Sequence, residues 1–208
     1  MLLSLVHYIY LDLYLNIFQD LQRKKRSDAT HNKAIILQTT TQLLAQGEDI
    51  SEMNMSEIAK KAGVGVGTLY RHFESKSLLC QAMMDEKVHD MFDEMDTFLH
   101  QHQDASVRDK IYGILSIYLD LKEANFNVLN FIEKSNSQHQ SMINIPFYEQ
   151  LKELIKDQFT SQQQTQDLEF KINLMLNSFS SDFYYFAKHD QQLTKDQFLS
   201  RLLDIFIG

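Results

Sequence analysis

The stretch that most constrains the fold is residues 55–76, M-S-E-I-A-K-K-A-G-V-G-V-G-T-L-Y-R-H-F-E-S-K. A helix is expected to begin there, because Asn54 and Glu57 have the spacing of a capping box, in which each side chain binds the other residue's backbone amide. Gly63 predicts the end of this helix, since glycine adopts the left-handed backbone of a helix C-terminus without steric cost. These signals predict a short helix that stops at a glycine corner.

A second short helix is expected to begin near Gly65 or Val66 and to end near Phe73. Its apolar residues Leu69 and Phe73 have the spacing of an inward face. Two helices joined by a glycine-containing turn form a helix-turn-helix, and the second helix of this motif lies in the DNA major groove. The stretch therefore predicts a DNA-binding unit, with an ordinary pair of surface helices as the alternative.

Side chains that form hydrogen bonds occupy the outward positions of this second helix. Hydroxyl, guanidinium and imidazole groups suit phosphate oxygens and base edges. The first helix opens with amide and hydroxyl side chains, which also bind phosphate at a helix start. The residues expected to contact DNA are Asn54, Ser56, Val66, Gly67, Thr68, Tyr70, Arg71, His72 and Lys76.

The block Ile58–Leu79, I-A-K-K-A-G-V-G-V-G-T-L-Y-R-H-F-E-S-K-S-L-L, resembles the DNA-binding signature of the TetR family of bacterial transcription repressors. The similarity continues upstream over Lys33–Gln46, within a helix expected from residue 27 or 28 to residue 46. The resemblance implies an all-helical homodimer with an N-terminal DNA-binding unit and a C-terminal core that binds a small inducer. It does not identify the inducer, because family members share the DNA-binding unit and differ in the rest.

The resemblance also implies roles for individual residues. Residues 67–70 are expected to lie closest to the bases, whereas Tyr70, His72 and Lys76 are expected to contact mainly phosphates. Arg71 stands where family members often carry an aromatic residue. As an arginine it has the geometry to bind guanine through two hydrogen bonds.

Charge is distributed unevenly along the chain, whose net charge is −8. Residues 23–76 hold nine basic and six acidic residues, whereas residues 77–208 hold eleven basic and twenty acidic ones. A positive field at the contact face attracts phosphate even when the whole protein is acidic. Nucleic-acid binding by the N-terminal unit is therefore compatible with the negative total.

Long stretches with a period of 3.6 residues, without convincing strand-type alternation, predict an all-α protein. One proline in 208 residues leaves few helix breaks. We expect an apolar extension over residues 1–22, a three-helix DNA-binding domain over residues 23–76, and a helical ligand-binding and dimerisation domain over residues 77–208. The single cysteine, Cys80, excludes an internal disulfide, fits a reducing cytoplasm and is expected to be a small buried apolar residue.

The N-terminal extension, residues 1–22, admits three interpretations. A membrane anchor is disfavoured, because Asp12 would lie near its middle at a cost of roughly 2.5–3.5 kcal/mol. The others are upstream sequence read as coding and an added helix that packs on the body. The basic cluster Arg23–Arg26 follows, either as an arm that reaches the DNA backbone or minor groove or as a solvated tail.

The remaining sequence predicts six helices in the second domain, over residues 77–100, 104–124, 126–135, 146–160, 167–189 and 194–207. The last two carry more apolar residues than one buried stripe needs, which implies a second partner. They resemble the family's dimer interface, with simple core packing as the alternative. The residues concerned are Phe170, Leu174, Leu176, Phe179, Phe183, Tyr184, Phe186, Phe198, Leu202, Ile205 and Phe206.

Motifs for catalysis are absent: the sequence has no G-x-S-x-G, no phosphate-binding glycine loop and no C-x-x-C. We therefore expect no enzyme activity, no cofactor and no metal site. His89 and the carboxylates of residues 86–96 have the spacing of metal ligands, but an acidic solvated helix face explains them more simply.

A small-molecule pocket is expected among the helices of the second domain, lined mostly by aromatic and flexible side chains with few polar groups. Glu133 is the candidate polar group, since a buried carboxylate would favour a cationic ligand. An exposed Glu133 and an ordinary aromatic core are the alternative. The candidate lining residues are Tyr112, Tyr118, Phe131, Glu133, Met142, Phe147, Tyr148, Phe179 and Tyr184.

Together these features predict a cytoplasmic, sequence-specific DNA-binding transcriptional repressor that a small-molecule inducer releases from its operator. The expected partners are double-stranded operator DNA, a second copy of the chain and an unknown inducer, without membrane association. A DNA-bound adaptor that has no inducer and recruits a protein is the alternative. An enzyme or lipid carrier that merely contains a helix-turn-helix is a further one.

Overall fold

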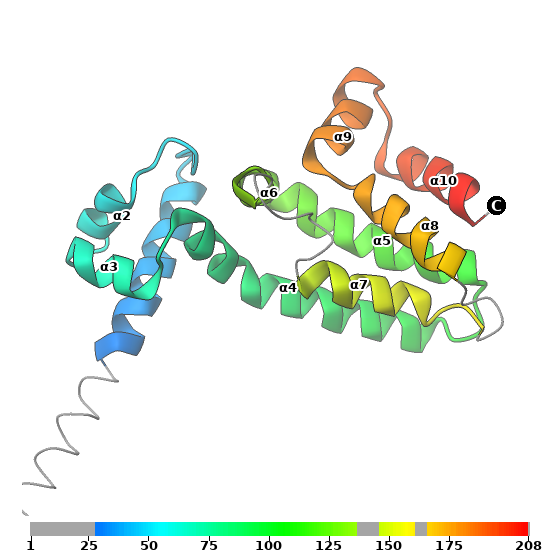
Figure 1. The fold of residues 1–208 in the computed structure, drawn as a ribbon, viewed down its shortest axis with the longest axis horizontal. Helices are drawn as coiled ribbons and strands as arrows, with labels where there is room; N and C mark the ends of the chain where they lie inside the picture. Colours follow the sequence, from blue (N-terminus) through cyan, green and yellow to red (C-terminus); the bar gives the residue numbers. More distant parts are fainter. Residues whose placement is uncertain (1–27, 137–145, 161–165, 208) are drawn as a thin grey trace, which may run out of the picture. The chain divides into compact units, whose positions relative to one another are not determined.

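The structure, a computed structural model, describes residues 28–136, 146–160 and 166–207, and every regular element in these ranges is a helix (Figure 1). The all-α class is therefore confirmed. The chain divides into two compact units between Leu79 and Cys80. The extension over residues 1–22, the basic cluster Arg23–Arg26 and the pocket candidate Met142 lie outside the described residues.

The first unit contains a helix over residues 28–45, then α2 (Met55–Lys61) and α3 (Val66–His72), which pack against each other. Its core consists of residues from all three helices, from the turn that follows the first one and from the segment that follows α3. These are Ile36, Leu43, Ile50, Met53, Met55, Ile58, Ala59, Leu69, Phe73 and Leu79. Within the first helix the buried stripe also includes Thr40, whose hydroxyl donates to the Ile36 carbonyl at 2.8 Å and so needs no water.

The second unit contains most of α4 (Lys76–Gln101), which begins in the first unit, followed by α5, α6, α7, α8, α9 and α10 (Figure 1). Their bounds are Val107–Ala124, Phe126–Asn136, Pro146–Lys156, Gln166–Asn177, Ser181–Tyr185 and Lys195–Phe206. Helix α5 packs against α6 and α10, α7 against α8, α6 against α9, and α8 against α10. Fully buried residues of α5, such as Ile114 and Leu115, form the centre of this core.

The single helix expected over residues 167–189 is wrong, because the chain turns after Asn177 and restarts at Ser181. The hydroxyl of Ser178 donates to the Leu174 carbonyl at 3.2 Å, and Ser180 adopts an extended ψ of 144°. Serine side chains compete for backbone groups in this way and favour helix ends over helix interiors. After α9 the chain continues as a π-helical turn, η2 (Phe186–Asp190).

The expectations for Pro146 and Cys80 are confirmed. Pro146 opens α7, where its missing amide leaves no hydrogen bond unmade. Helix α10 begins with a capping box between Thr194 and Gln197. Cys80 is buried. None of the helices within the described ranges combines the length and apolar character needed to cross a membrane.

Candidate nucleic-acid interface and ligand cavity

The turn between α2 and α3 has the geometry that its sequence predicts. Asn54 Oδ1 accepts from the Glu57 amide at 2.9 Å, and the Glu57 carboxylate accepts from the Asn54 amide, so the capping box is confirmed. Gly63 has a φ of +67°, in the left-handed region that only glycine adopts freely. The Val64 amide then donates to the Ala59 carbonyl at 3.0 Å, which closes the end of α2.

Helix α3 has one buried face and one open face. Leu69 is fully buried, and Phe73, just after the helix, is also in the core. Tyr70 on the other face is 48% exposed, and Arg71 beside it is exposed. A Cβ atom added at Gly67 would meet nothing within 4 Å, so the first turn of α3 has open space in front of it. The helix thus presents hydrogen-bonding side chains and a bare backbone turn to solvent.

The remaining residues expected on the DNA side take different positions. Val66 is exposed, whereas Thr68 and His72 are half-buried. Asn54 and Ser56 are exposed, and the Ser56 hydroxyl donates to Asn54 Oδ1 at 2.9 Å. The start of α2 therefore already uses these two polar side chains within its own cap.

Lys76 has partners within the first unit. Its ammonium donates to the carbonyls of Ser51 and Met53, at 2.8 and 2.7 Å, in the turn before α2. A cation in the first turn of a helix gains nothing from the helix dipole, and these carbonyls offset that unfavourable position without a phosphate. Lys76 therefore fixes the turn over residues 49–53, and a phosphate contact by this residue stays a prediction.

A cavity of about 370 Å³ lies in the second unit among α4, α5, α6 and α7. Helix α4 contributes Met84 and Asp85, α5 contributes Tyr118, α6 contributes Glu133 and α7 contributes Tyr148. Its other lining residues are Gln81, Val88, Leu121, Leu129, Ile132, Phe147 and Gln150. The lining is mostly apolar with a few polar groups, which is the usual composition of a small-molecule site.

Two tyrosine hydroxyls meet at one wall of this cavity. Tyr118 and Tyr148 lie 2.9 Å apart through their hydroxyl oxygens, and Phe147 packs against both rings, with ring centroids at 5.4 and 4.7 Å. Burial raises the pKa of both hydroxyls, and the negative charge of Glu133 raises each further. Both tyrosines therefore stay protonated and are available as hydrogen-bonding groups.

Glu133 forms a salt bridge with a buried lysine. Lys122 has no exposed surface and donates to Glu133 Oε1 at 2.6 Å, while the Ser181 amide donates to Glu133 Oε2 at 2.7 Å. The Glu133 side chain is 12% exposed. Burial lowers the pKa of Lys122, although the carboxylate of Glu133 opposes this shift. Glu133 lines the cavity and Lys122 does not.

Comparison with known proteins decides the family. The family described as "Bacterial regulatory proteins, tetR family" matches residues 36–83. An HTH-type transcriptional regulator of Staphylococcus aureus (strain MRSA252) is 63% identical over 186 residues, which cover 89% of this chain and 97% of that protein. This chain belongs to the TetR family. It is therefore a helix-turn-helix transcriptional regulator, and α2 and α3 form its DNA-binding motif.

Solved structures of TetR regulators have the same fold. A TetR transcriptional regulator from Rhodococcus sp. RHA1 aligns with a TM-score of 0.58 at 19% identity and covers 86% of this chain and 96% of its own. The transcriptional regulator FadR from Bacillus subtilis, in complex with stearoyl-CoA, aligns with a TM-score of 0.51 at 17% identity and covers 84% and 97%. At these identities the similarity concerns the fold alone.

The structure of this TetR-family chain brings together only some of the residues expected in the pocket. Tyr118, Glu133, Phe147 and Tyr148 line one cavity.

The other described residues expected in the pocket lie elsewhere. The Tyr112 hydroxyl donates to Asp196 at 2.8 Å. Phe179 packs in the core against Phe198, Tyr184 donates to Glu123, and Phe131 is half-buried on α6 outside the lining. Ligand binding by these four stays a prediction.

The contribution of α4 to this cavity was not predicted from the sequence. Gln81, Met84, Asp85 and Val88 line it from one helix. Their spacing of three and four residues marks one helix face, and this is the only signal that sequence alone carries. Nothing in that spacing distinguishes a face that lines a cavity from one that packs in a core.

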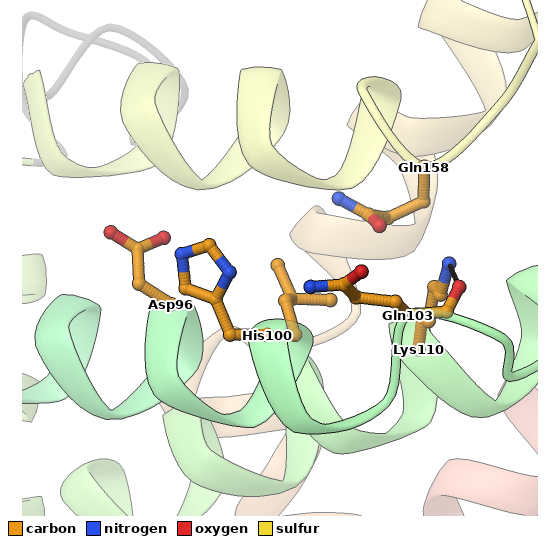
Figure 2. Close-up of a pocket in the computed structure, with 6 residues that line it drawn as sticks. Asp96, His100, Gln103, Lys110 and Gln158 are labelled. Atoms are coloured by element: carbon orange, nitrogen blue, oxygen red, sulfur yellow. Dashed lines mark hydrogen bonds between the residues drawn. The ribbon is translucent and has the colours of Figure 1, made fainter.

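Two other hollows in the second unit are poorer candidates. The one in Figure 2 is open to solvent and most of its lining residues are of polar types; the labelled residues Asp96 and His100 project from α4 beside Gln103, Lys110 and Gln158. Lys110 donates to the Gln103 carbonyl, so its ammonium is already engaged. The other hollow is about 210 Å³ and lies beside Tyr184 and Lys188, which both bind Glu123. Across the described ranges, no group of three or more His, Cys, Asp or Glu side chains could hold a metal ion.

Proposed function

We propose that the protein is a homodimeric, cytoplasmic repressor that binds an operator through α3 and leaves it when a small molecule occupies the cavity of the second unit. The open face of α3 carries this proposal. Tyr70 and Arg71 present hydrogen-bonding groups to solvent. On the opposite side, Leu69 and Phe73 are buried in the core of the first unit. A rigid helix with such a face suits base edges and phosphates in the major groove.

The dimer part of the proposal rests on apolar side chains that α8, α9, η2 and α10 leave exposed. These are Phe170, Leu174, Phe183, Tyr185, Phe186 and Ile205. Of the other residues expected at a dimer interface, five are buried in the core of one chain and Phe206 is half-buried; the five are Leu176, Phe179, Tyr184, Phe198 and Leu202. Exposed aromatic and aliphatic residues gathered on neighbouring helices are typical of an interaction surface. A second copy would cover them and supply the second DNA-binding unit that a two-fold operator requires, about 34 Å away.

The inducer part rests on the cavity and on α4. The cavity volume of about 370 Å³ lies within the range of small-molecule sites. Helix α4 carries both Lys76, which binds the turn before α2, and residues Met84 and Asp85 of the cavity wall. A ligand that prefers one arrangement of α4 would shift the population of DNA-binding states. A coupling of about 1–3 kcal/mol changes DNA affinity by roughly 5–150-fold. The stearoyl-CoA bound to FadR supports the idea that this fold holds a small molecule.

Footprinting on the DNA that flanks the protein's own coding region tests the proposal. We expect one or two protected segments with two-fold sequence symmetry. A thermal-shift screen of small molecules should then find a ligand that lowers operator affinity in an anisotropy titration. Absence of any protected segment would overturn the repressor. Protection that no ligand relieves would favour an adaptor that recruits a protein.

A further inference from the structure

The part of the cavity wall that the structure describes carries carboxylates but no positively charged side chain. Glu133 and Asp85 line it, and among its described lining residues there is no lysine or arginine. Lys122 is fully buried outside this lining and donates its hydrogen bond to Glu133. The ionised groups among the described lining residues are therefore both carboxylates.

Glu133 keeps binding capacity despite its two partners. Lys122 occupies one acceptor position on Oε1, and the Ser181 amide occupies one on Oε2. A carboxylate has about four acceptor positions in total. Each oxygen can therefore accept one further hydrogen bond from a donor in the cavity, and a bond to a charged donor is about twice as strong as a neutral one.

The cavity wall next to Glu133 has side chains that suit the apolar body of an organic cation. Tyr118, Phe147 and Tyr148 form an aromatic cluster, and Met84 is a buried thioether on the α4 side. The face of an aromatic ring attracts an ammonium group, and a thioether adapts to apolar groups of irregular shape. Both features favour an organic ion with an apolar body over a hydrated inorganic ion.

We infer that this cavity binds an organic cation, with an ammonium group against Glu133 and an apolar body against Tyr118, Phe147 and Met84. The inference rests on the proposed function and names the class of its ligand. An anionic ligand such as a fatty carboxylate would place its charge beside Glu133 and Asp85. The described lining offers this charge no lysine or arginine as a partner, and Lys122 is already bound to Glu133 outside the lining, so this class is disfavoured.

Three probes with one skeleton test the charge preference directly: phenylbutylamine, phenylbutanol and phenylbutyrate. They share the aromatic body and differ in a head group that is positive, neutral or negative at neutral pH. Isothermal titration calorimetry on the full chain should show the amine binding about tenfold more tightly than the alcohol, which corresponds to about 1.4 kcal/mol. Phenylbutyrate should bind most weakly.

Substitutions of Glu133 and Asp85 test whether these cavity residues cause the preference for the amine. Glu133→Gln and Asp85→Asn should each reduce the ratio of amine to alcohol affinity, whereas Glu94→Gln, an exposed residue of α4 outside the cavity, should leave it unchanged. Because Glu133→Gln leaves Lys122 buried without its carboxylate, the double variant Lys122→Met/Glu133→Gln provides a second test with no buried charge. This pair should also lose the preference.

The outcomes separate this inference from the proposed function. Equal affinity for amine and alcohol, tighter binding of phenylbutyrate, or no binding of the amine would overturn the inference. A preference that survives Glu133→Gln, the double variant and Asp85→Asn would overturn it as well. If the amine binds as expected but leaves operator affinity unchanged, the cation site stands and control of DNA binding by this cavity fails.

Discussion

Lys122, which has no exposed surface, donates a hydrogen bond to Glu133 across 2.6 Å. Glu133 also accepts from the Ser181 amide, so one carboxylate joins α5, α6 and the start of α9. A buried ion pair contributes little when compared with a well-packed apolar pair, but breaking it by removal of one partner leaves an uncompensated charge. The stability of the second unit should therefore depend on both residues together.

Replacement of Lys122 by methionine should lower the free energy of unfolding by roughly 3 kcal/mol, because Glu133 loses its counter-charge. The double variant Lys122→Met/Glu133→Gln should recover most of this loss. Lys195→Met is the control, since its pair with Asp120 has the same 2.6 Å length but is far more exposed, and it should cost less than about 1 kcal/mol. Urea denaturation followed by circular dichroism measures all three. Equal losses for Lys122→Met and Lys195→Met would contradict the role of burial.

A second carboxylate makes stability depend on pH. Glu123 of α5 accepts from Lys188 and from the Tyr184 hydroxyl. Burial alone would raise the pKa of its carboxyl, but these hydrogen bonds and the charges of Lys188 and Lys195 lower the pKa below its ordinary value of 4.5. A carboxyl with a lowered pKa adds stability above that ordinary value, and this stability is lost as the pH falls through the folded-state pKa.

Glu123→Gln should therefore destabilise the protein at neutral pH, and the difference from the native sequence should shrink as the pH falls below 4.5. Urea denaturation at a series of pH values measures it. The exposed Glu94→Gln variant should follow the native curve throughout. A difference for Glu123→Gln that stays constant across the acid range would rule out this carboxyl as its source.

Gly113 permits a close contact between α5 and α4. A Cβ atom at this position would lie 2.1 Å from two ring atoms of Phe98. Gly113→Ala should therefore destabilise the protein by about 1–3 kcal/mol through overpacking, although alanine favours a helix over glycine by about 1 kcal/mol. In a Phe98→Ala background the same substitution should become stabilising. A double-mutant cycle measures the coupling, and additive effects would contradict the contact.

Local signals in the sequence predicted the DNA-binding motif closely. Asn54, Glu57 and Gly63 act through backbone groups a few residues away, so their spacing alone placed the ends of α2 and the start of α3. The break between α8 and α9 was missed, because apolar periodicity continues through Phe179 while the serines on either side bend the chain. Periodicity reports which residues are apolar and says little about a turn that keeps them buried.

The cavity was predicted in part, because its members come from helices that meet only in the folded chain. Glu133 and the tyrosines were found by residue type, whereas Asp85 on α4 resembles any exposed acidic residue. Lys122 was missed for the same reason: lysine is seldom buried, and only the position of Glu133 eleven residues later explains this one. Pairing across helices is a property of packing that spacing does not reveal.

Arg71→Ala tests how the outer face of α3 reads DNA. If Arg71 binds guanine through two hydrogen bonds, its loss should weaken operator binding by about 1–3 kcal/mol and reduce the preference over unrelated DNA. Anisotropy titrations on operator and scrambled duplexes measure both effects. Lys156→Ala removes the same charge in the second unit and is the control. An equal loss on both duplexes would instead make Arg71 a phosphate contact, with a reduced salt dependence.

Two exposed residues provide a test of the dimer. They are Phe170 of α8 and Ile205 of α10, with 64% and 74% of their surfaces accessible in one chain. If a second copy covers them, Phe170→Asp and Ile205→Asp each place a charge in an apolar interface, which is strongly unfavourable. The mass measured by sedimentation equilibrium should then change from that of two chains to that of one, and operator affinity should fall because the half-sites are bound separately.

Leu78→Asp introduces the same charge at an exposed leucine of the first unit and should leave the dimer intact. A native chain that sediments as one copy would contradict the dimer. Dissociation by Leu78→Asp alone would instead place the contact between copies in the first unit.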